Sequence, residues 1–231
     1  MMLHSIPEDL HFLRFVLPYM LSNMYLCIGG REALIIDPQP SEEALAVLMY
    51  ASVQDALILL THEHFDHTAG VNFFRRYLSS VRVLAHEATA HHIADTRNNR
   101  PLSLLKMVTE ENRAELLAAY HSYIVEPIAV DAYLTEGQQL LWCDHVIAVS
   151  EVPGHSPGSL LFTVDDVGTF TGDYLIPQTS VILRYPGGSE ATYREITLPK
   201  LWEIPNGRII FPGHGEPYCF AHPTVDMTKS R

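Results

Sequence analysis

The sequence predicts an α/β fold in which two β-sheets pack together with helices on their outer sides. Short apolar runs bounded by turn residues occur in the first part of the chain and again in its last part. Between them, from about residue 86 to 132, apolar residues recur at helical spacing. Strands, then helices, then strands again are typical of a layered domain. We therefore expect residues 1–231 to form a single domain with a helical insertion at about 86–132.

The first part of the chain alternates apolar runs with turn residues. Ser41 is expected to cap a helix with Ala44 and Leu48 on its apolar face. A second helix is expected over residues 68–78. The run 56–60 is apolar at every position, as in strands that are buried on both faces. Strands are expected at residues 12–17, 24–28, 33–36, 56–60 and 81–85.

Strands return after the helical stretch. A helix is expected around residues 193–202, and the glycines between the runs mark tight turns. Each of three expected strands runs directly into a glycine-containing turn, which places polar side chains at the ends of strands. The expected strands lie at residues 140–142, 146–152, 159–164, 169–171 and 208–211.

Composition excludes several classes of protein. The chain is 47% hydrophobic and 18% charged, which suits a globular protein. No apolar run reaches the roughly 18–20 residues that span a bilayer, and Glu8 and Asp9 replace the basic start of a secretory signal, so we expect a cytoplasmic protein without a membrane partner. Three cysteines at unrelated spacings indicate neither a disulfide framework nor a thiolate zinc site. A net charge of −12 argues against a nucleic-acid partner.

A dense group of metal-binding side chains follows the apolar run 56–60. His62, His64 and Asp66 stand at alternate positions, so extended backbone would project them to one side. His67 follows where the chain is expected to turn into the next helix, and its side chain would approach from another angle. Four such residues within six positions predict a metal site.

Three later segments each add one residue of the same kind. His155 lies in Pro-Gly-His-Ser-Pro-Gly, Asp173 in Thr-Gly-Asp, and His214 in Pro-Gly-His-Gly. Each segment ends an expected strand, and its glycines let the backbone pass close to a compact centre. Imidazoles and carboxylates without a thiolate suit zinc, iron or manganese.

This pattern resembles the metallo-β-lactamase-fold hydrolases, and its turns are most similar to the glyoxalase II (hydroxyacylglutathione hydrolase) branch. The segments at residues 23–26, 35–38 and 184–188 resemble that family too, so the similarity runs from about residue 12 to 217. The resemblance implies an αβ/βα four-layer sandwich with the metals at one edge of the sheets. It also implies a hydrolase in which a dinuclear site activates a hydroxide that cleaves a thioester.

The resemblance also assigns the ligands of two divalent metal ions, with zinc favoured and iron or manganese as alternatives. Asp66 is expected to orient the nucleophile in addition to binding metal, and Asp37 to be a turn residue or a partner of a ligand. A thiol leaves as thiolate without a general acid, which fits a thioester. The first metal would take His62, His64 and His155, the second Asp66, His67 and His214, and Asp173 would bridge them.

Other functions of the same fold remain as alternatives. Lactonases usually carry a tyrosine shortly after the bridging aspartate, and Tyr174 directly follows Asp173, although at a different offset. A mono-iron persulfide dioxygenase has a similar His-to-Asp spacing, but its glycine-cysteine-glycine-arginine signature is missing. The acidic charge disfavours a phosphodiesterase. A metal-binding sensor module is the non-enzymatic alternative, although none of the ligands is lost.

Substrate recognition is expected to differ from that of glyoxalase II. Only 17 residues follow His214, whereas a helical C-terminal extension supplies part of the glutathione site in glyoxalase II. The insertion is longer than usual and carries four cations, and the loop after Asp173 carries Arg184. Arginine suits recognition of carboxylates. We expect an anionic thioester, such as one of glutathione or coenzyme A, to be bound between Arg184 and the insertion residues Arg97, Arg100, Lys106 and Arg113.

Overall fold

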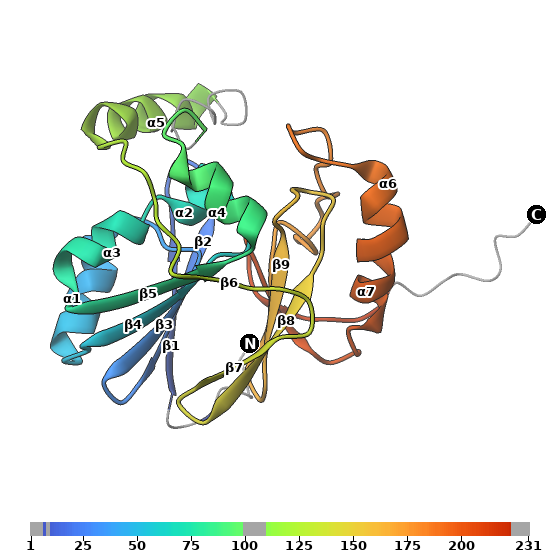
Figure 1. Ribbon diagram of the computed structural model, residues 1–231, viewed down its shortest axis with the longest axis horizontal. Coiled ribbons are helices and arrows are strands. Elements are labelled where there is room, and N and C mark those ends of the chain that lie inside the picture. Colours follow the sequence, from blue (N-terminus) through green and yellow to red (C-terminus); the bar gives the residue numbers. More distant parts are fainter. Residues whose placement is uncertain (1–6, 8–9, 99–109, 223–231) are drawn as a thin grey trace, which may run out of the picture.

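Two six-stranded β-sheets lie at the centre of the molecule (Figure 1). The computed structural model describes residue 7 and residues 10–98 and 110–222. In the first sheet the strands follow chain order, antiparallel from β1 to β3 and parallel from β3 to β6. Its strands are β1 (Leu10–Val16), β2 (Asn23–Gly29), β3 (Glu32–Ile36), β4 (Asp55–Leu59), β5 (Ser80–Ala85) and β6 (Ala132–Tyr133).

The second sheet contains the remaining strands in the order β12-β11-β10-β9-β8-β7. Only the β10–β11 pair is parallel within this sheet. The sequence predicted all of its strands except the two-residue β12, as it missed the equally short β6 in the first sheet. The strands are β7 (Gln139–Trp142), β8 (His145–Glu151), β9 (Leu160–Val164), β10 (Gly168–Gly172), β11 (Ile209–Pro212) and β12 (Tyr218–Cys219).

Three apolar clusters fill the spaces between four layers. In β2, Tyr25 and Cys27 belong to the cluster between the sheets, whereas Met24 and Leu26 pack toward the helices that cover the first sheet. A third cluster lies between the second sheet and a helix that contributes Leu201. Because alternate side chains of a strand point to opposite faces, a strand covered on both faces must be apolar throughout. The predicted αβ/βα four-layer sandwich is confirmed (Figure 1).

The helices on the first sheet largely match the prediction. Ser41 caps α1 (Glu42–Tyr50), because its Oγ accepts a hydrogen bond from Ala44 N at 3.1 Å. The helix predicted over 68–78 is two helices, α2 (Phe65–Thr68) and α3 (Val71–Tyr77). Between them Gly70 approaches the backbone of Gln39 so closely that a Cβ atom would lie 2.5 Å from it. The second sheet is covered by α6 (Glu190–Thr192), a π-helical turn η2 (Tyr193–Thr197) and α7 (Leu198–Glu203).

The predicted insertion is helical only in part. It contains α4 (Glu87–Ala94) and α5 (Glu110–Ser122), and its residues 99–109, including Arg100 and Lys106, lie outside the described residues. Residues 123–131 are not helical, and Ile128 packs into the cluster beneath the helices. None of the helices that the structure describes has the length and apolarity to cross a bilayer.

Candidate metal centre

The residues of the first motif lie at the edge of the sheets where β4 ends. Thr61 to His64 form a loop, so His62 and His64 are placed by extended backbone as predicted. The prediction was wrong for Asp66, which lies together with His67 on the short helix α2. Helical backbone separates the two groups of side chains, because Asp66 and His67 turn away from the direction that His62 and His64 share.

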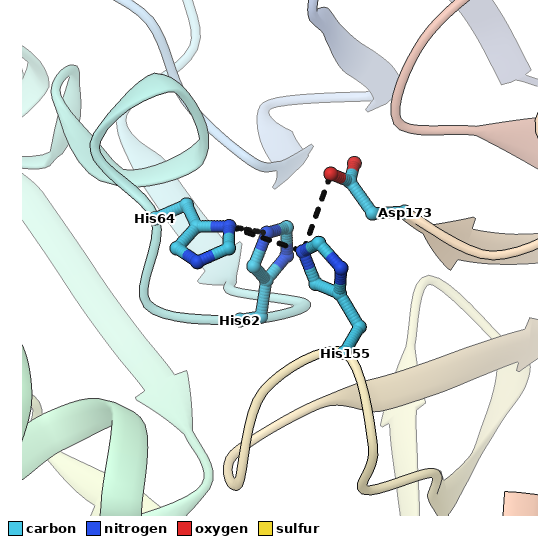
Figure 2. A group of neighbouring side chains, drawn as sticks. All are labelled: His62, His64, His155 and Asp173. Carbon is cyan, nitrogen blue, oxygen red and sulfur yellow. Dashed lines mark hydrogen bonds and ion pairs between the residues drawn. The ribbon is translucent and has the colours of Figure 1, made fainter. Parts of the chain in front are cut away.

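Three histidines form a first cluster, composed of His62, His64 and His155. His62 Nε2 lies 3.0 Å from His64 Nδ1, and His155 Nε2 lies 3.1 Å from the same atom. Figure 2 shows the three rings converging from two loops, with Asp173 reaching toward them from the end of β10. The ring nitrogens therefore surround one point rather than facing separate partners.

A second cluster is formed by Asp66, His67 and His214. The Nε2 atoms of His67 and His214 each lie 3.5 Å from Asp66 Oδ2. His214 is brought in by the turn after β11, where Ser22 pairs with it in an isolated β-bridge. Ser22 Oγ also donates a hydrogen bond to the backbone oxygen of Asp66 at 3.1 Å. Segments that are far apart in the sequence thus hold the second cluster together.

Asp173 lies between the clusters, with one carboxylate oxygen toward each. Its Oδ2 lies 3.3 Å from His155 Nε2 in the first cluster. Its Oδ1 lies 3.3 Å from His67 Nε2 and 3.5 Å from His214 Nε2 in the second. His67 Nε2 and Asp173 Oδ1 are both buried and make no hydrogen bond within the described part of the chain. Buried polar atoms of this kind require a partner, and a cation would satisfy both.

The donor spacing fits metal ions. Ligand atoms that are 2.0–2.1 Å from a tetrahedral zinc ion lie about 3.3 Å from one another. The contacts between donor atoms run from 3.0 Å for His62 and His64 to 3.5 Å for His214 and Asp66. Two of the three ligand groups found among the described residues contain all seven residues predicted from the sequence, and their nitrogen and oxygen atoms suit divalent ions. The third group combines Asp37 with His62 and His67.

Contacts behind the rings fix which nitrogen faces the centre. His62 Nδ1 lies 3.0 Å from Thr61 Oγ1, and His155 Nδ1 lies 2.8 Å from the carbonyl oxygen of Ile182. His67 Nδ1 lies 2.9 Å from Asp37 Oδ2. Such outer partners set the tautomer and orientation of metal-binding histidines. Asp37, with φ of 53°, is both the turn residue and the ligand partner that the sequence predicted.

The two clusters differ in their electrostatics. Burial lowers the pKa of His62, and it lowers the pKa of His64 to about 4, with neighbouring histidines adding to the effect. Burial acts in the same direction on His67 and His214, but the nearby carboxylates outweigh it and raise the pKa of both. Conversely, the histidines hold the pKa of Asp173 well below its usual range despite burial.

Glu63 has a structural role that the sequence did not reveal. It stands between His62 and His64, yet its side chain is buried. Glu63 Oε2 accepts hydrogen bonds from Ser156 Oγ at 2.7 Å and from Thr89 Oγ1 at 3.2 Å. It therefore joins the motif to the loop of His155 and to α4. A charged residue at a position expected to be buried was the only available signal.

The tyrosines after Asp173 were interpreted incompletely from the sequence. Tyr174 is buried; its hydroxyl donates to the carbonyl oxygen of Val152 at 2.6 Å and accepts from His155 N at 2.7 Å. It thus supports the ligand backbone and cannot serve as a lactonase-type tyrosine. Tyr185 instead lies against the first cluster, with its ring centroid 5.5 Å from that of His64, and burial raises its pKa. Arg184 beside it is exposed.

Comparison with known proteins agrees with this geometry. The model of the Metallo-beta-lactamase superfamily matches residues 18–214. A hydroxyacylglutathione hydrolase of Anaeromyxobacter dehalogenans is 29% identical over 82% of this chain and 60% of its own length. An acyl-coenzyme A thioesterase of Gallus gallus, MBLAC2, is 25% identical over 84% of this chain and 72% of its own length. The crystal structure of TTHA1623 in a di-iron-bound form is 27% identical, with a TM-score of 0.67 over 90% of this chain and 94% of that one.

The extent of the match settles the family but not the substrate. The chain spans only 60% of the length of the hydroxyacylglutathione hydrolase, so the similarity to that enzyme is partial. The superfamily match, in contrast, runs from the loop after β1 to the last histidine of the second cluster. The chain therefore belongs to the metallo-β-lactamase superfamily of hydrolases.

Proposed function

We propose that this chain is a hydrolase that binds two divalent metal ions and cleaves a thioester. The observation that carries the proposal is the position of Asp173, whose two oxygens face different clusters. Zinc is the favoured metal, with iron or manganese as alternatives. The first ion would be held by His62, His64 and His155, the second by Asp66, His67 and His214, with Asp173 shared between them.

When bound, such ions supply Lewis-acid chemistry, which lowers the pKa of water from 15.7 toward about 7 and stabilises developing negative charge. Asp66 would orient the nucleophile, because its Oδ2 is the atom that faces both histidines of the second cluster. Tyr185 keeps its phenolic proton because burial raises its pKa, so it suits donation of a hydrogen bond to a substrate oxygen.

A thioester fits the residues around the site better than an amide does. A thiol with a pKa of about 8.5 leaves as thiolate and needs no general acid. The other buried carboxylates near the ligands already have partners: Asp37 accepts hydrogen bonds from Thr61, and Glu63 accepts them from two hydroxyls. The similar hydroxyacylglutathione hydrolase and acyl-coenzyme A thioesterase are named for substrates that are acylated thiols.

Arg184 is proposed to bind an anionic group of the thiol part. It is exposed beside Tyr185, which itself lies against His64, so a carboxylate or phosphate at Arg184 would be close to the first cluster. No ion pair or hydrogen bond to Arg184 is found within the described residues. An unpaired guanidinium next to a substrate site suits bidentate recognition of such an anion.

The alternatives within the fold have less support. A mono-iron persulfide dioxygenase would leave the complete second cluster without a role. A lactonase of the usual kind lacks its tyrosine, because both hydrogen-bonding capacities of the Tyr174 hydroxyl are used. The acidic chain is poorly suited to a phosphodiester polymer, and a sensor module would not need every ligand to be present.

The proposal is tested by assaying the zinc-loaded protein on thioesters, a lactone, a phosphodiester and glutathione persulfide. We expect thioesters to give the highest kcat/KM and a chelator to abolish the activity. His91→Ala, at an exposed histidine on α4, serves as a control that should keep wild-type activity. Faster turnover of the lactone, the phosphodiester or the persulfide than of every thioester would refute the proposal.

A further inference from the structure

A groove of about 540 Å³ lies between α5 and the loop that joins β1 to β2. Leu17, Pro18 and Tyr19 of the loop line one side of it. Ala118 of α5 and Tyr123, which follows the helix, line the other. The volume is within the range of sites for small molecules, about 300–1,000 Å³.

This groove lies next to the second cluster. The loop that forms one wall ends at Ser22, which pairs with His214 and donates a hydrogen bond to the backbone of Asp66. On the other wall, the ring of Tyr123 packs 4.8 Å from that of Phe65, the residue before Asp66. One wall therefore contacts two ligands of the proposed second metal site, and the other wall contacts the residue before one of those ligands.

The walls of the groove are poor in positive charge. Glu115 is the one charged residue among those that line it in the described part of the chain. Two cations of the insertion that were expected to bind an anion are already paired, Arg97 with Asp95 and Arg113 with Glu110. The part of the insertion that lines the groove in the described residues thus offers a surface without a cation, whereas Arg100 and Lys106 lie outside the described residues. An uncharged apolar group suits this surface, because its burial gains free energy without a desolvated charge.

The surroundings of the first cluster, in contrast, are polar and carry a positive charge. Tyr185 lies against His64 and His155 of the first cluster, and Arg184 adds a positive charge there. We propose that the groove beneath α5 binds the apolar acyl chain of a thioester, while its anionic thiol part lies at Arg184. This inference rests on the proposed thioester hydrolase and adds the orientation and the class of its substrate.

Chain length is the most direct test of the groove. We expect kcat/KM of the zinc-loaded protein to rise from acetyl to octanoyl thioesters of glutathione, by up to about fourfold for each methylene, which is ~0.8 kcal/mol of burial converted to a rate ratio. Ala118→Trp fills the groove and should lower kcat/KM for the octanoyl thioester at least tenfold while changing that of the acetyl thioester less than twofold. Leu117→Trp is the matched control, since Leu117 is exposed on the same helix and does not line the groove.

A binding measurement separates this inference from the proposed reaction. S-octylglutathione and S-methylglutathione are thioethers that cannot be hydrolysed, and calorimetry on the zinc-loaded protein measures their affinities. We expect the octyl compound to bind more tightly, and Ala118→Trp but not Leu117→Trp to remove the difference. That result without hydrolysis of any thioester would support the apolar site and refute the reaction. Equal affinities, or an unchanged chain-length dependence in Ala118→Trp, would refute the proposal that the groove binds the acyl chain.

Discussion

The two clusters of the candidate metal centre use similar residues in different electrostatic surroundings. In the first, neutral groups support the rings of His62 and His155, and the pKa of His62 is lowered by burial. In the second, three carboxylates surround His67 and raise its pKa against the effect of burial. The lowered pKa values of His62 and His64 favour the neutral imidazoles that bind metal, whereas the raised pKa values of His67 and His214 favour protons that a metal must replace.

The bridging position of Asp173 is where the two clusters depend on each other most strongly. Asp173→Ala should weaken both metal sites, because a carboxylate between two cations offsets their mutual repulsion. His214→Ala should weaken only the second. We expect Asp173→Ala to lose most of both metals by elemental analysis and to lower activity at least about 100-fold. Loss of the same single metal from both variants would mean that Asp173 does not bridge.

The carboxylate behind His67 should matter to the second cluster alone. Asp37→Asn keeps the size of the side chain but weakens the hydrogen bond that orients His67. We expect a 10–100-fold loss in affinity for the second metal, as for other partners of metal-binding histidines, with the first metal unchanged. Competition with a chelating dye measures both affinities. Equal weakening of the two metals would indicate a general loss of structure rather than a local effect.

Glu63 should affect the first cluster more than the second. Glu63→Ala removes the acceptor that joins the His155 loop to the motif, so we expect about a tenfold loss in affinity for the first metal. Glu63→Gln keeps one acceptor oxygen and should recover most of it. The visible absorption of the cobalt-substituted protein reports the ligand geometry directly. An alanine variant with the wild-type cobalt spectrum and affinity would show that the loop is positioned without Glu63.

The protonation difference predicts how the stability of the metal-free protein depends on pH. About one pH unit above the ordinary histidine pKa of 6.5, His62 and His64 are neutral in the unfolded chain, and in the folded chain they are neutral already at lower pH because their pKa values are lowered. His67 and His214 have raised pKa values, so their stabilisation is complete below pH ~6.5 and is lost as the pH rises through those values.

We therefore expect the free energy of unfolding of the metal-free protein to fall between pH 6.5 and 9, by at most about 1.4 kcal/mol per pH unit for each proton. Urea unfolding after chelation measures it. Asp37→Asn should flatten the dependence, because it removes one of the charges that raise the pKa of His67. A free energy that is constant or rises over this range would contradict the assigned difference between the clusters.

Local patterns in the sequence predicted most of the fold and all seven candidate ligands. The four-layer arrangement follows from strands such as β2, which is apolar at nearly every position because both of its faces are covered. The ligands His155, Asp173 and His214 could be predicted because each lies in a glycine-containing turn at the end of a strand, which places its side chain at one edge of the sheets. The conformation of Asp66 could not be predicted, because ligands at alternate positions are compatible with a strand and equally with a loop followed by a helical turn.

Long-range contacts explain what the sequence could not predict. The short strand β6 exists only because Ala132 and Tyr133 pair with β5, from which α4, α5 and the residues beyond them separate it in the chain. The hydrogen bonds that bury the carboxylate of Glu63 come from Thr89 and Ser156, which lie 26 and 93 positions further along the chain. The support that Tyr174 gives His155 likewise depends on a contact across 19 positions.

Zinc titration of the metal-free protein tests the central claim, which is that two ions bridged by the carboxylate of Asp173 form one active site. Activity on a thioester and bound metal are followed together as zinc is added in steps. We predict that little activity accompanies the first equivalent and that activity rises with the second, because Asp66, His67 and His214 complete the site only then. Full activity at one equivalent of zinc, unchanged by more, would contradict the account.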